Sequence, residues 1–383
     1  MKKIAIIGAG ISGLFIANLL RQDSNYDITI YEKNNFINLE KGYGIQLSVN
    51  SVKLLNKIGF QNIDQLNKFN PNKVDFYSLQ KKQKICDLNI SEFNTDNAKY
   101  TTLQRSTLIE FLKEKIPTNL IQYNKKIKQV DNKNETVMLT FENNSSAEYD
   151  YLVISDGVFS PTKSLVANKQ IEPKYFNSIA VRATINQNNL EGIDPNNISL
   201  FLGSNFHSVV YPVDKNSEFN FIGILRKNLT NNQLQNYSLF SENSFISSIL
   251  SELSGQIDQN ILENINNIKC FPIFISNEIY DQQHKNIFLI GDAFFAFPPS
   301  FAQGASQSIE AAFELFEYIN KNSNDFNKRR IEKTKMINNR SKFNHFVFHL
   351  SNPLIIFVRD FILRNLVKNK KFLENYLGKI YKN

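Results

Sequence analysis

The chain of 383 residues contains no tryptophan, only two cysteines and only four histidines. Cys86 and Cys270 lie far apart and form no CxxC pair, which argues against a disulfide reductase and against a cysteine metal site. The simplest interpretation is two reduced thiols in a cytoplasmic protein. None of the histidines stands in a metal-binding repeat such as HExxH, so we expect no metal site.

The sequence also lacks a long apolar run and a concentrated basic stripe. No stretch approaches the roughly 18 apolar residues of a membrane span, and glycines soon interrupt the apolar run that follows Lys2 and Lys3. We therefore expect neither a membrane span nor a signal peptide. The net charge of +8 favours anionic ligands. Because the lysines are scattered and aromatics do not interleave with them, we expect no nucleic-acid partner.

A strand–helix–strand pattern opens the chain. Lys3–Ile7 is a short apolar run typical of a buried strand, and Ile11–Arg21 carries apolar residues at helical spacing. Asp27–Tyr31 predicts a second strand. This βαβ unit within about thirty residues is typical of dinucleotide-binding folds.

Further periodic segments extend the α/β pattern. We expect helices over Thr107–Ile116 and Ala305–Asn320, and a mostly helical tail from Asp325. The middle of the chain alternates short strands with Asn-rich turns. The other expected strands are Glu148–Ser155, Ser208–Val213, Phe219–Leu225 and Asn286–Ile290. The sequence predicts an α/β protein: a discontinuous Rossmann-like domain (1–74, 98–171 and 270–335), a β-rich substrate domain (75–97 and 172–269) and C-terminal helices (336–383).

The first turn carries a GxGxxG fingerprint between the expected strand and helix. Gly8 permits the tight turn, Gly10 lets the backbone approach a pyrophosphate, and Gly13 permits close helix–strand packing. The helix N-terminus offers free N–H groups to phosphates. An acidic residue about 20 positions on accepts hydrogen bonds from a ribose diol, although a surface glutamate after a glycine turn would look the same. The candidate residues are Gly8, Gly10, Ile11, Ser12, Gly13, Glu32 and Lys33.

Three more segments complete a family pattern. Ser155-Asp156-Gly157 follows one expected strand, Gly291-Asp292-Ala293 follows another, and the stretch from Gly42 to Asn50 reads GYGIQLSVN. With the first fingerprint, these segments resemble the class A flavoprotein monooxygenases of the para-hydroxybenzoate hydroxylase fold. The salicylate hydroxylase and meta-hydroxybenzoate hydroxylase subgroup is the most similar. The resemblance implies a GR2-type FAD-binding domain.

The resemblance also assigns the cofactor contacts. It places Asp292 against the ribityl hydroxyls of FAD, and Gly304 and Ala305 at the flavin N1–C2 edge, where a helix N-terminus stabilises the negative charge of reduced flavin. Pro298 and Pro299 would form a rigid wall beside the ring. Gln46 and Arg105 match further cofactor-contacting segments.

The DG motif, Asp156 and Gly157, lies near the pyrophosphate in this family and is implicated in nicotinamide use. Asp156 can equally cap a turn. Two residues depart from the family pattern: Phe295 replaces a histidine and Lys163 replaces an arginine. No second GxGxxG occurs, so we expect NADH or NADPH to bind transiently rather than in a domain of its own.

The resemblance implies that O2 and a flavin C4a-hydroperoxide hydroxylate an aromatic, phenolic small molecule. His207 and Tyr211 match a family stretch that meets substrate, and strand alternation puts both on one face. Together with Pro298 and Gln303, they are the candidate catalytic residues. Either His207 or Tyr211 could help to remove the phenol proton, but His207 could also be only a structural, hydrogen-bonded residue.

Two other functions remain open from the sequence. The basic, apolar tail Phe357–Lys382 suggests a ubiquinone-pathway or other lipid-precursor hydroxylase that touches an anionic membrane. A packed helix with a solvated basic face would look the same. The loss of the histidine at Phe295 would also fit a non-catalytic FAD-binding redox protein. The chain is expected to be a monomer or a homodimer.

Overall fold

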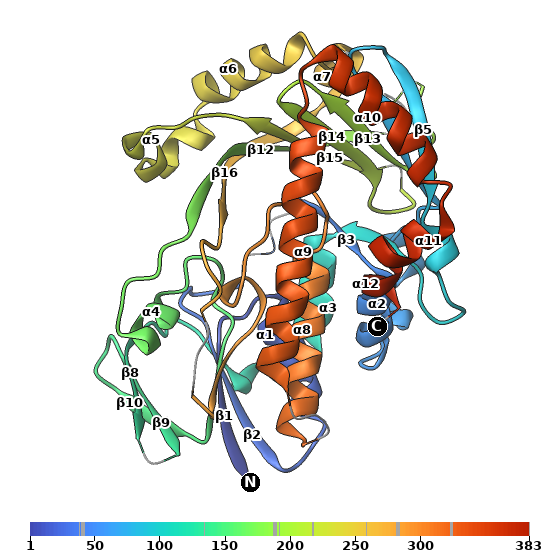
Figure 1. Ribbon diagram of the computed structural model, residues 1–383. Helices are drawn as coiled ribbons and strands as arrows, with labels where there is room; N and C mark the ends of the chain where they lie inside the picture. The colour runs from blue at the N-terminus through green and yellow to red at the C-terminus, as the bar shows by residue number, and fades with distance from the viewer. Residues whose placement is uncertain are drawn as a thin grey trace.

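The computed structural model describes most of the chain in atomic detail (Figure 1). The described residues are 1–37, 39, 43–133, 135–186, 190, 192–216, 218–257, 259–280, 284–321 and 325–382, without the side chains of 259 and 260.

A five-stranded parallel sheet forms the nucleotide-binding half, in the order β17-β11-β1-β2-β7. The side chains of β1 pack alternately into two hydrophobic cores, because successive side chains of a strand point to opposite faces. Ile4 and Ile6 face the helices, whereas Ala5 and Ile7 face a three-stranded antiparallel sheet, β10-β9-β8. The strands are β1 (Lys2–Ile7), β2 (Tyr26–Tyr31), β7 (Ile121–Gln122), β8 (Ile127–Lys133), β9 (Thr136–Phe141), β10 (Ser146–Tyr149), β11 (Tyr151–Ile154) and β17 (Ile287–Leu289).

A seven-stranded mixed sheet forms the other half, in the order β16-β12-β15-β14-β13-β4-β5. One face packs on α6 and α7, with Phe206, Phe221 and Ile249 in the shared core. The opposite face looks toward the nucleotide-binding half (Figure 1). The strands are β4 (Lys73–Ser78), β5 (Gln83–Asn89), β12 (Lys174–Asn186), β13 (Ile198–Gly203), β14 (Phe206–Pro212), β15 (Glu218–Arg226) and β16 (Asn266–Ile275).

Helices and one short ribbon join the two halves. The long helix α9 runs from the parallel sheet up to the seven-stranded sheet (Figure 1). The ribbon of β3 (Gly44–Leu47) and β6 (Thr101–Gln104) hydrogen-bonds to the larger sheet, where the Gly44 N–H donates to Asn220 Oδ1 at 2.7 Å. The helices are α1 (Ile11–Leu20), α2 (Val49–Asn56), α3 (Arg105–Glu114), α4 (Pro161–Ala167), α5 (Asn231–Gln235), α6 (Asn243–Ser254), α7 (Gln259–Asn264), α8 (Gly304–Ile319), α9 (Phe326–Phe348), α10 (Pro353–Leu366), α11 (Lys370–Leu373) and α12 (Lys379–Tyr381).

The predicted α/β fold class is confirmed, and most expected elements lie within one or two residues of their predicted bounds. The expected strand Glu148–Ser155 was wrong as a single element. It divides into β10 and β11, which belong to different sheets. Asp150 lies at the division, where its carboxylate accepts hydrogen bonds from the Lys3 N–H and the Lys2 ammonium, both at 2.7 Å. This contact fixes the chain against the start of β1.

Candidate active site

The glycine fingerprint forms the predicted strand–turn–helix between β1 and α1. Gly8 has a φ of +98°, a conformation that glycine adopts without strain. A Cβ on Gly13 would lie 2.1 Å from the Gly8 carbonyl oxygen, so Gly13 permits the close packing expected of it. A Cβ on Gly10 would meet nothing within 4 Å. The turn therefore leaves open space beside Gly10, where the fingerprint predicts a pyrophosphate.

Glu32 lies at the end of β2, beside this turn. Its carboxylate accepts hydrogen bonds from the Ala9 N–H and the Asn34 N–H, both at 3.0 Å. Ile11 and Ser12 begin α1, and Lys33 is exposed. Glu32 thus holds the glycine turn to β2, and its ribose contact stays a prediction.

The DG motif follows β11 and leads into α4. Gly157 has a φ of +88°, and the Thr162 N–H donates to Asp156 Oδ2 at 3.4 Å, so Asp156 does cap the turn before α4. Its Oδ1 atom is buried and has no partner among the described residues. Burial raises the pKa of Asp156. A free carboxylate oxygen is compatible with a second, cofactor-contacting role.

Asp292 follows β17 and lines a large cavity with a volume of about 740 Å³. Its side chain is exposed to this cavity, yet the surrounding protein shields it from bulk water and raises its pKa to about 6, an effect that the positive charge of Arg105 opposes. Arg105 begins α3 and is itself exposed. The described residues donate no hydrogen bond to this carboxylate, which is therefore suited to accept hydrogen bonds from sugar hydroxyls.

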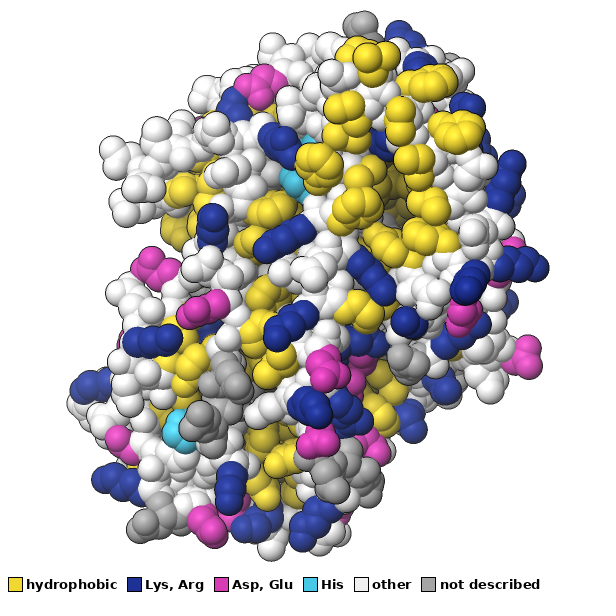
Figure 2. Space-filling model, in the orientation of Figure 1, with side chains coloured by type: hydrophobic (Ala, Val, Ile, Leu, Met, Phe, Trp, Pro, Cys, Tyr) yellow, Lys and Arg dark blue, Asp and Glu magenta, His cyan; other side chains and the backbone are white. Residues whose placement is uncertain are grey.

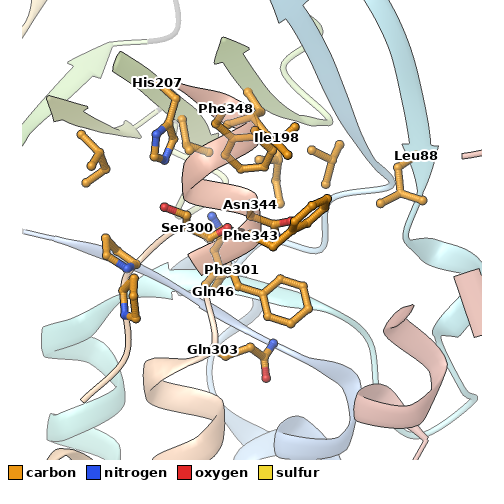
Figure 3. Close-up of a pocket in the computed structure, with 18 of the residues that line it drawn as sticks. Gln46, Leu88, Ile198, His207, Ser300, Phe301, Gln303, Phe343, Asn344 and Phe348 are labelled. Atoms are coloured by element: carbon orange, nitrogen blue, oxygen red, sulfur yellow. Dashed lines mark hydrogen bonds between the residues drawn. The ribbon is translucent and has the colours of Figure 1, made fainter. Parts of the chain in front are cut away.

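The same cavity brings together most of the predicted catalytic and flavin-contacting residues. Loop 296–303 and the start of α8 form its floor, and β14 and α9 contribute its upper wall (Figure 3). The predicted residues that line it are Gln46, His207, Tyr211, Asp292, Pro298, Pro299, Gln303, Gly304 and Ala305. Gly42, which begins the GYGIQLSVN stretch, lies outside the described residues.

Gln303 is oriented by a chain of donors that starts on α9. The buried Arg330 can only donate, so it fixes the Oε1 atom of Gln307 toward itself at 2.9 Å. Gln307 then donates from Nε2 to Gln303 Oε1 at 3.2 Å. This leaves Gln303 Nε2 buried and without a partner among the described residues. Gln303 therefore lines the cavity with an N–H donor that no described residue occupies (Figure 3).

Arg182 is a cavity residue that sequence reasoning missed. It lies on β12, lines the cavity and stacks over the Tyr43 ring, 4.7 Å from the centroid. Burial lowers its pKa, whereas Tyr211 and Tyr43 act in the opposite direction. Tyr211 is buried, and its pKa is raised by burial although Arg182 and a hydrogen bond to Gln46 oppose the shift. The sequence signal that could have identified Arg182 is a positively charged residue within an otherwise apolar strand.

His207 belongs to a cluster of three buried histidines. Its Nδ1 atom lies 2.6 Å from His349 Nε2, and His345 Nδ1 lies 3.1 Å from Ser300 Oγ. The candidate ligand atoms of the three imidazoles lie within 4.8 Å of one another. Burial lowers the pKa of His207 to about 3, and the neighbouring His345 adds to this shift. Burial lowers the pKa of His345 to about 4, and the positive charge of Arg226 adds to that shift.

Sequence reasoning missed this cluster because it spans β14 and the end of α9. The signal was the spacing of His345 and His349, which puts both on one face of a helix. The neighbouring positive charge of Arg226, which lowers the pKa of His345 and His349, also disfavours a bound cation. The absence of a metal stays a prediction.

The two departures from the family pattern have clear structural settings. Phe295 is buried and its ring lies 5.2 Å from that of Phe297, so it packs in the core. Lys163 is buried in α4, where burial lowers its pKa although Asp156 opposes the shift. Neither residue obstructs the space at Gly10 or the cavity at Asp292. The residues present therefore fit FAD.

Comparison with known proteins agrees with this site. A family model described as "FAD binding domain" matches residues 1–328. The chain is 25% identical over 325 residues to 6-hydroxynicotinate 3-monooxygenase of Bordetella bronchiseptica (strain ATCC BAA-588 / NCTC 13252 / RB50), covering 82% of this chain and 81% of that protein. It is 22% identical to salicylate hydroxylase of Pseudomonas putida, covering 82% and 75%.

Solved structures share the fold. A salicylate hydroxylase substrate complex superposes with a TM-score of 0.80 at 17% identity, covering 100% of this chain and 95% of that one. Klebsiella pneumoniae HpxO complexed with FAD and uric acid gives 0.75 at 17% identity, covering 99% and 96%. The resemblance to class A flavoprotein monooxygenases is confirmed. The chain belongs to the FAD-binding domain family, and FAD is its cofactor.

Proposed function

We propose that the protein hydroxylates an electron-rich, phenolic small molecule, using O2 and either NADH or NADPH. One observation carries the proposal: the polar residues of a single cavity converge on the loop that the resemblance places at the flavin ring. Bound FAD supplies the redox chemistry, accepting hydride from the nicotinamide and activating O2. The protein's own residues bind the substrate, orient it and exclude water. The relatives named above are monooxygenases of aromatic compounds, which supports this substrate class.

The charges in the cavity favour an ionised phenol. Arg182 places a positive charge among apolar walls, where it stabilises a phenolate or carboxylate more strongly than it would in water. A phenolate is more electron-rich than a phenol, so it is the better acceptor of an electrophilic oxygen. Gln303 Nε2 and the neutral Tyr211 hydroxyl can donate hydrogen bonds to the same anion.

His207 is better suited to orient the substrate than to remove its proton. An efficient general base has a pKa near the working pH, whereas the pKa of His207 is lowered to about 3. His349 occupies its Nδ1 atom. We therefore assign His207 as a neutral hydrogen-bonding partner of the substrate, and Pro298 and Pro299 as the rigid wall beside the reacting ring.

Arg182→Gln tests this proposal. It should lower kcat/KM for a hydroxybenzoate about 100-fold, since a hydrogen bond to a charged group contributes up to about 3 kcal/mol. Lys174→Gln is the matched control, because Lys174 is an exposed cation at the start of the same strand. The measurement is NADH and NADPH oxidation with a panel of hydroxybenzoates, with the hydroxylated product quantified. If no phenol stimulates oxidation by the wild-type protein, the proposed function fails.

We also propose that the C-terminal helices contact an anionic membrane surface peripherally. In the part of the chain that the structure describes, no helix is long and apolar enough to cross a membrane. Helix α10, however, buries the charged pair Arg359 and Asp360, which lie 2.8 Å apart, and exposes its large apolar residues. The apolar patch appears at the upper right of Figure 2. It consists of Phe343, Phe346, Leu354, Ile355, Phe357, Val358, Phe361 and Ile362.

This arrangement favours lipid as the partner of the patch. Exposed basic residues flank the patch on α9, α10, α11 and the turn between α10 and α11, where they can meet anionic headgroups. They are Lys342, Arg364, Lys368, Lys370 and Lys371. A patch of large apolar side chains left in water is unfavourable for a monomer, so a covering surface is expected.

Replacing Phe357 and Phe361 together with glutamate should reduce binding to phosphatidylserine vesicles by about tenfold, because buried apolar area and charge both favour the contact. Leu66→Glu is the control, since Leu66 is an exposed apolar residue outside the patch. Co-sedimentation with vesicles and the oligomeric state are measured in parallel. If the double variant dissociates a homodimer while vesicle binding stays unchanged, a second copy covers the patch and the membrane proposal is wrong.

A further inference from the structure

The cavity has two ends of different chemistry. At one end Gln303 lies on the flavin loop, and Tyr211 interacts with Arg182 and Gln46. His207 lies on the upper wall, across the cavity from Gln303 (Figure 3). The other end lies between the seven-stranded sheet and α10, and Figure 3 shows Leu88 and Ile198 on the side away from Gln303. We call this end the apolar arm. Its lining includes Val74, Phe76, Leu88, Leu200, Val358 and Ile362.

Ionised groups near the apolar arm are already paired with protein. Arg359 lines the cavity, but its guanidinium donates to the Asp360 carboxylate from Nε at 3.0 Å and from Nη2 at 2.8 Å. Asp360 in turn pairs with Lys81 at 3.2 Å. The arm thus presents chiefly aliphatic and aromatic carbon to a ligand. A small polar aromatic acid would leave this surface uncovered.

The arm reaches the surface within the apolar patch. Phe343, Ile355, Val358 and Ile362 line the cavity and are also members of the patch, each at least 47% exposed. These four residues make the mouth of the arm apolar. The aliphatic chain of a ligand can therefore run from the polar end of the cavity to the apolar patch on the surface. Neighbouring patch members Phe357 and Phe361 do not line the cavity, so they allow the arm to be tested separately from the patch.

We infer that the substrate is amphiphilic: a phenolic ring held at the polar end, with an aliphatic chain that lies in the apolar arm and leaves through the patch. This inference rests on the proposed function and names its substrate class. The chain anchors the ring by burial of its methylene groups, which transfers them from water to an apolar wall. Binding energy remote from the ring is thereby available to orient it for reaction.

The test is a series of phenols with unbranched alkyl chains from methyl to octyl, each used below its micellar concentration. For the wild-type protein we expect kcat/KM to rise about three- to fourfold with each methylene, as burial of a CH2 group predicts. Calorimetric binding to the FAD-loaded protein should follow the same trend and does not depend on turnover. Ile362→Glu and Val358→Glu should abolish most of this gain, because they place a carboxylate in the arm.

Phe361→Glu is the matched control for these variants. It adds the same charge to the same helix outside the arm, so the gain with chain length should be retained. The inference is overturned if methyl and octyl phenols bind and react equally well in the wild-type protein, or if Phe361→Glu removes the gain as fully as Ile362→Glu. In both of those cases phenol-stimulated NAD(P)H oxidation continues, whereas failure of the proposed function would remove it for every phenol.

Discussion

Gly13→Ala is expected to lower the free energy of unfolding by about 3 kcal/mol or more and to abolish FAD binding. The added methyl group would lie 2.1 Å from the Gly8 carbonyl oxygen and 2.6 Å from Ser155 Oγ. The first contact is with the backbone, which cannot move aside without shifting the strand, and the second is with a short, hydrogen-bonded hydroxyl side chain. Ser155 Oγ also donates to the Ile7 carbonyl at 2.8 Å, so relief of the contact would separate α1 from two strands of the sheet.

Gly10→Ala separates cofactor binding from folding. Its φ of −88° is accessible to alanine, and the new methyl group would meet no protein atom within 4 Å. The apoprotein should keep its stability within about 0.5 kcal/mol. FAD affinity should fall at least about tenfold, since the methyl group would take the space of the pyrophosphate. Urea unfolding and flavin fluorescence titration measure the two effects. Wild-type FAD affinity in Gly10→Ala would contradict the assigned position of the phosphates.

The histidine cluster should make the protein acid-sensitive. The three imidazoles are buried and neutral, with pKa values of about 3 for His207 and about 4 for His345, and a lowered pKa for His349. In the unfolded chain a histidine titrates near pH 6.5. Below that pH the histidines of the unfolded chain bind protons, whereas those of the native cluster stay neutral. The free energy of unfolding therefore decreases as the pH falls from about 6.5 toward about 4.

The expected loss is large relative to the stability of a typical protein. At one pH unit below 6.5, each excluded proton costs about 1.4 kcal/mol, so three histidines together cost about 4 kcal/mol. Asp156 and Asp292, whose pKa values are raised, act in the opposite direction. The comparison is therefore between variants: His345→Asn should lessen the acid-induced loss by about a third, while His284→Gln, outside the cluster, should not change it. The free energy of unfolding of each variant is measured in urea at pH 8 and 5.5. An equal decrease between these pH values in both variants would contradict this account.

Local patterns predicted the nucleotide-binding half well. The bounds of β1, α1 and β2 follow from short apolar runs and the glycine turn, because both are properties of neighbouring residues. The cavity lining was also predicted in part, since Asp292, Pro298 and Gln303 belong to one matched segment. Asp156 shows the limit of a motif: the structure places it as a turn cap, and its cofactor contact stays a prediction.

Features formed by distant segments were not predicted. His207 is 142 residues from His349, and only the packing of α9 against β14 brings their rings together. Arg182 stands out in the sequence only as a charged residue in an apolar strand, and its position beside Tyr211 depends on the packing of the sheet. The sequence of the tail is basic and apolar, but helical periodicity does not show that α10 buries its charged pair, Arg359 and Asp360. These properties depend on how elements pack, which a local pattern does not encode.

The most direct test of the hydroxylase account is oxygen labelling. The purified, FAD-loaded protein is incubated with NADH or NADPH, isotopically labelled O2 and an alkyl phenol, and the product is analysed by mass spectrometry. The account predicts one labelled oxygen atom in a new ring hydroxyl group for each product molecule. Nicotinamide oxidation that sends all of the label to hydrogen peroxide with every phenol, or a hydroxyl group carrying unlabelled oxygen from water, would contradict it.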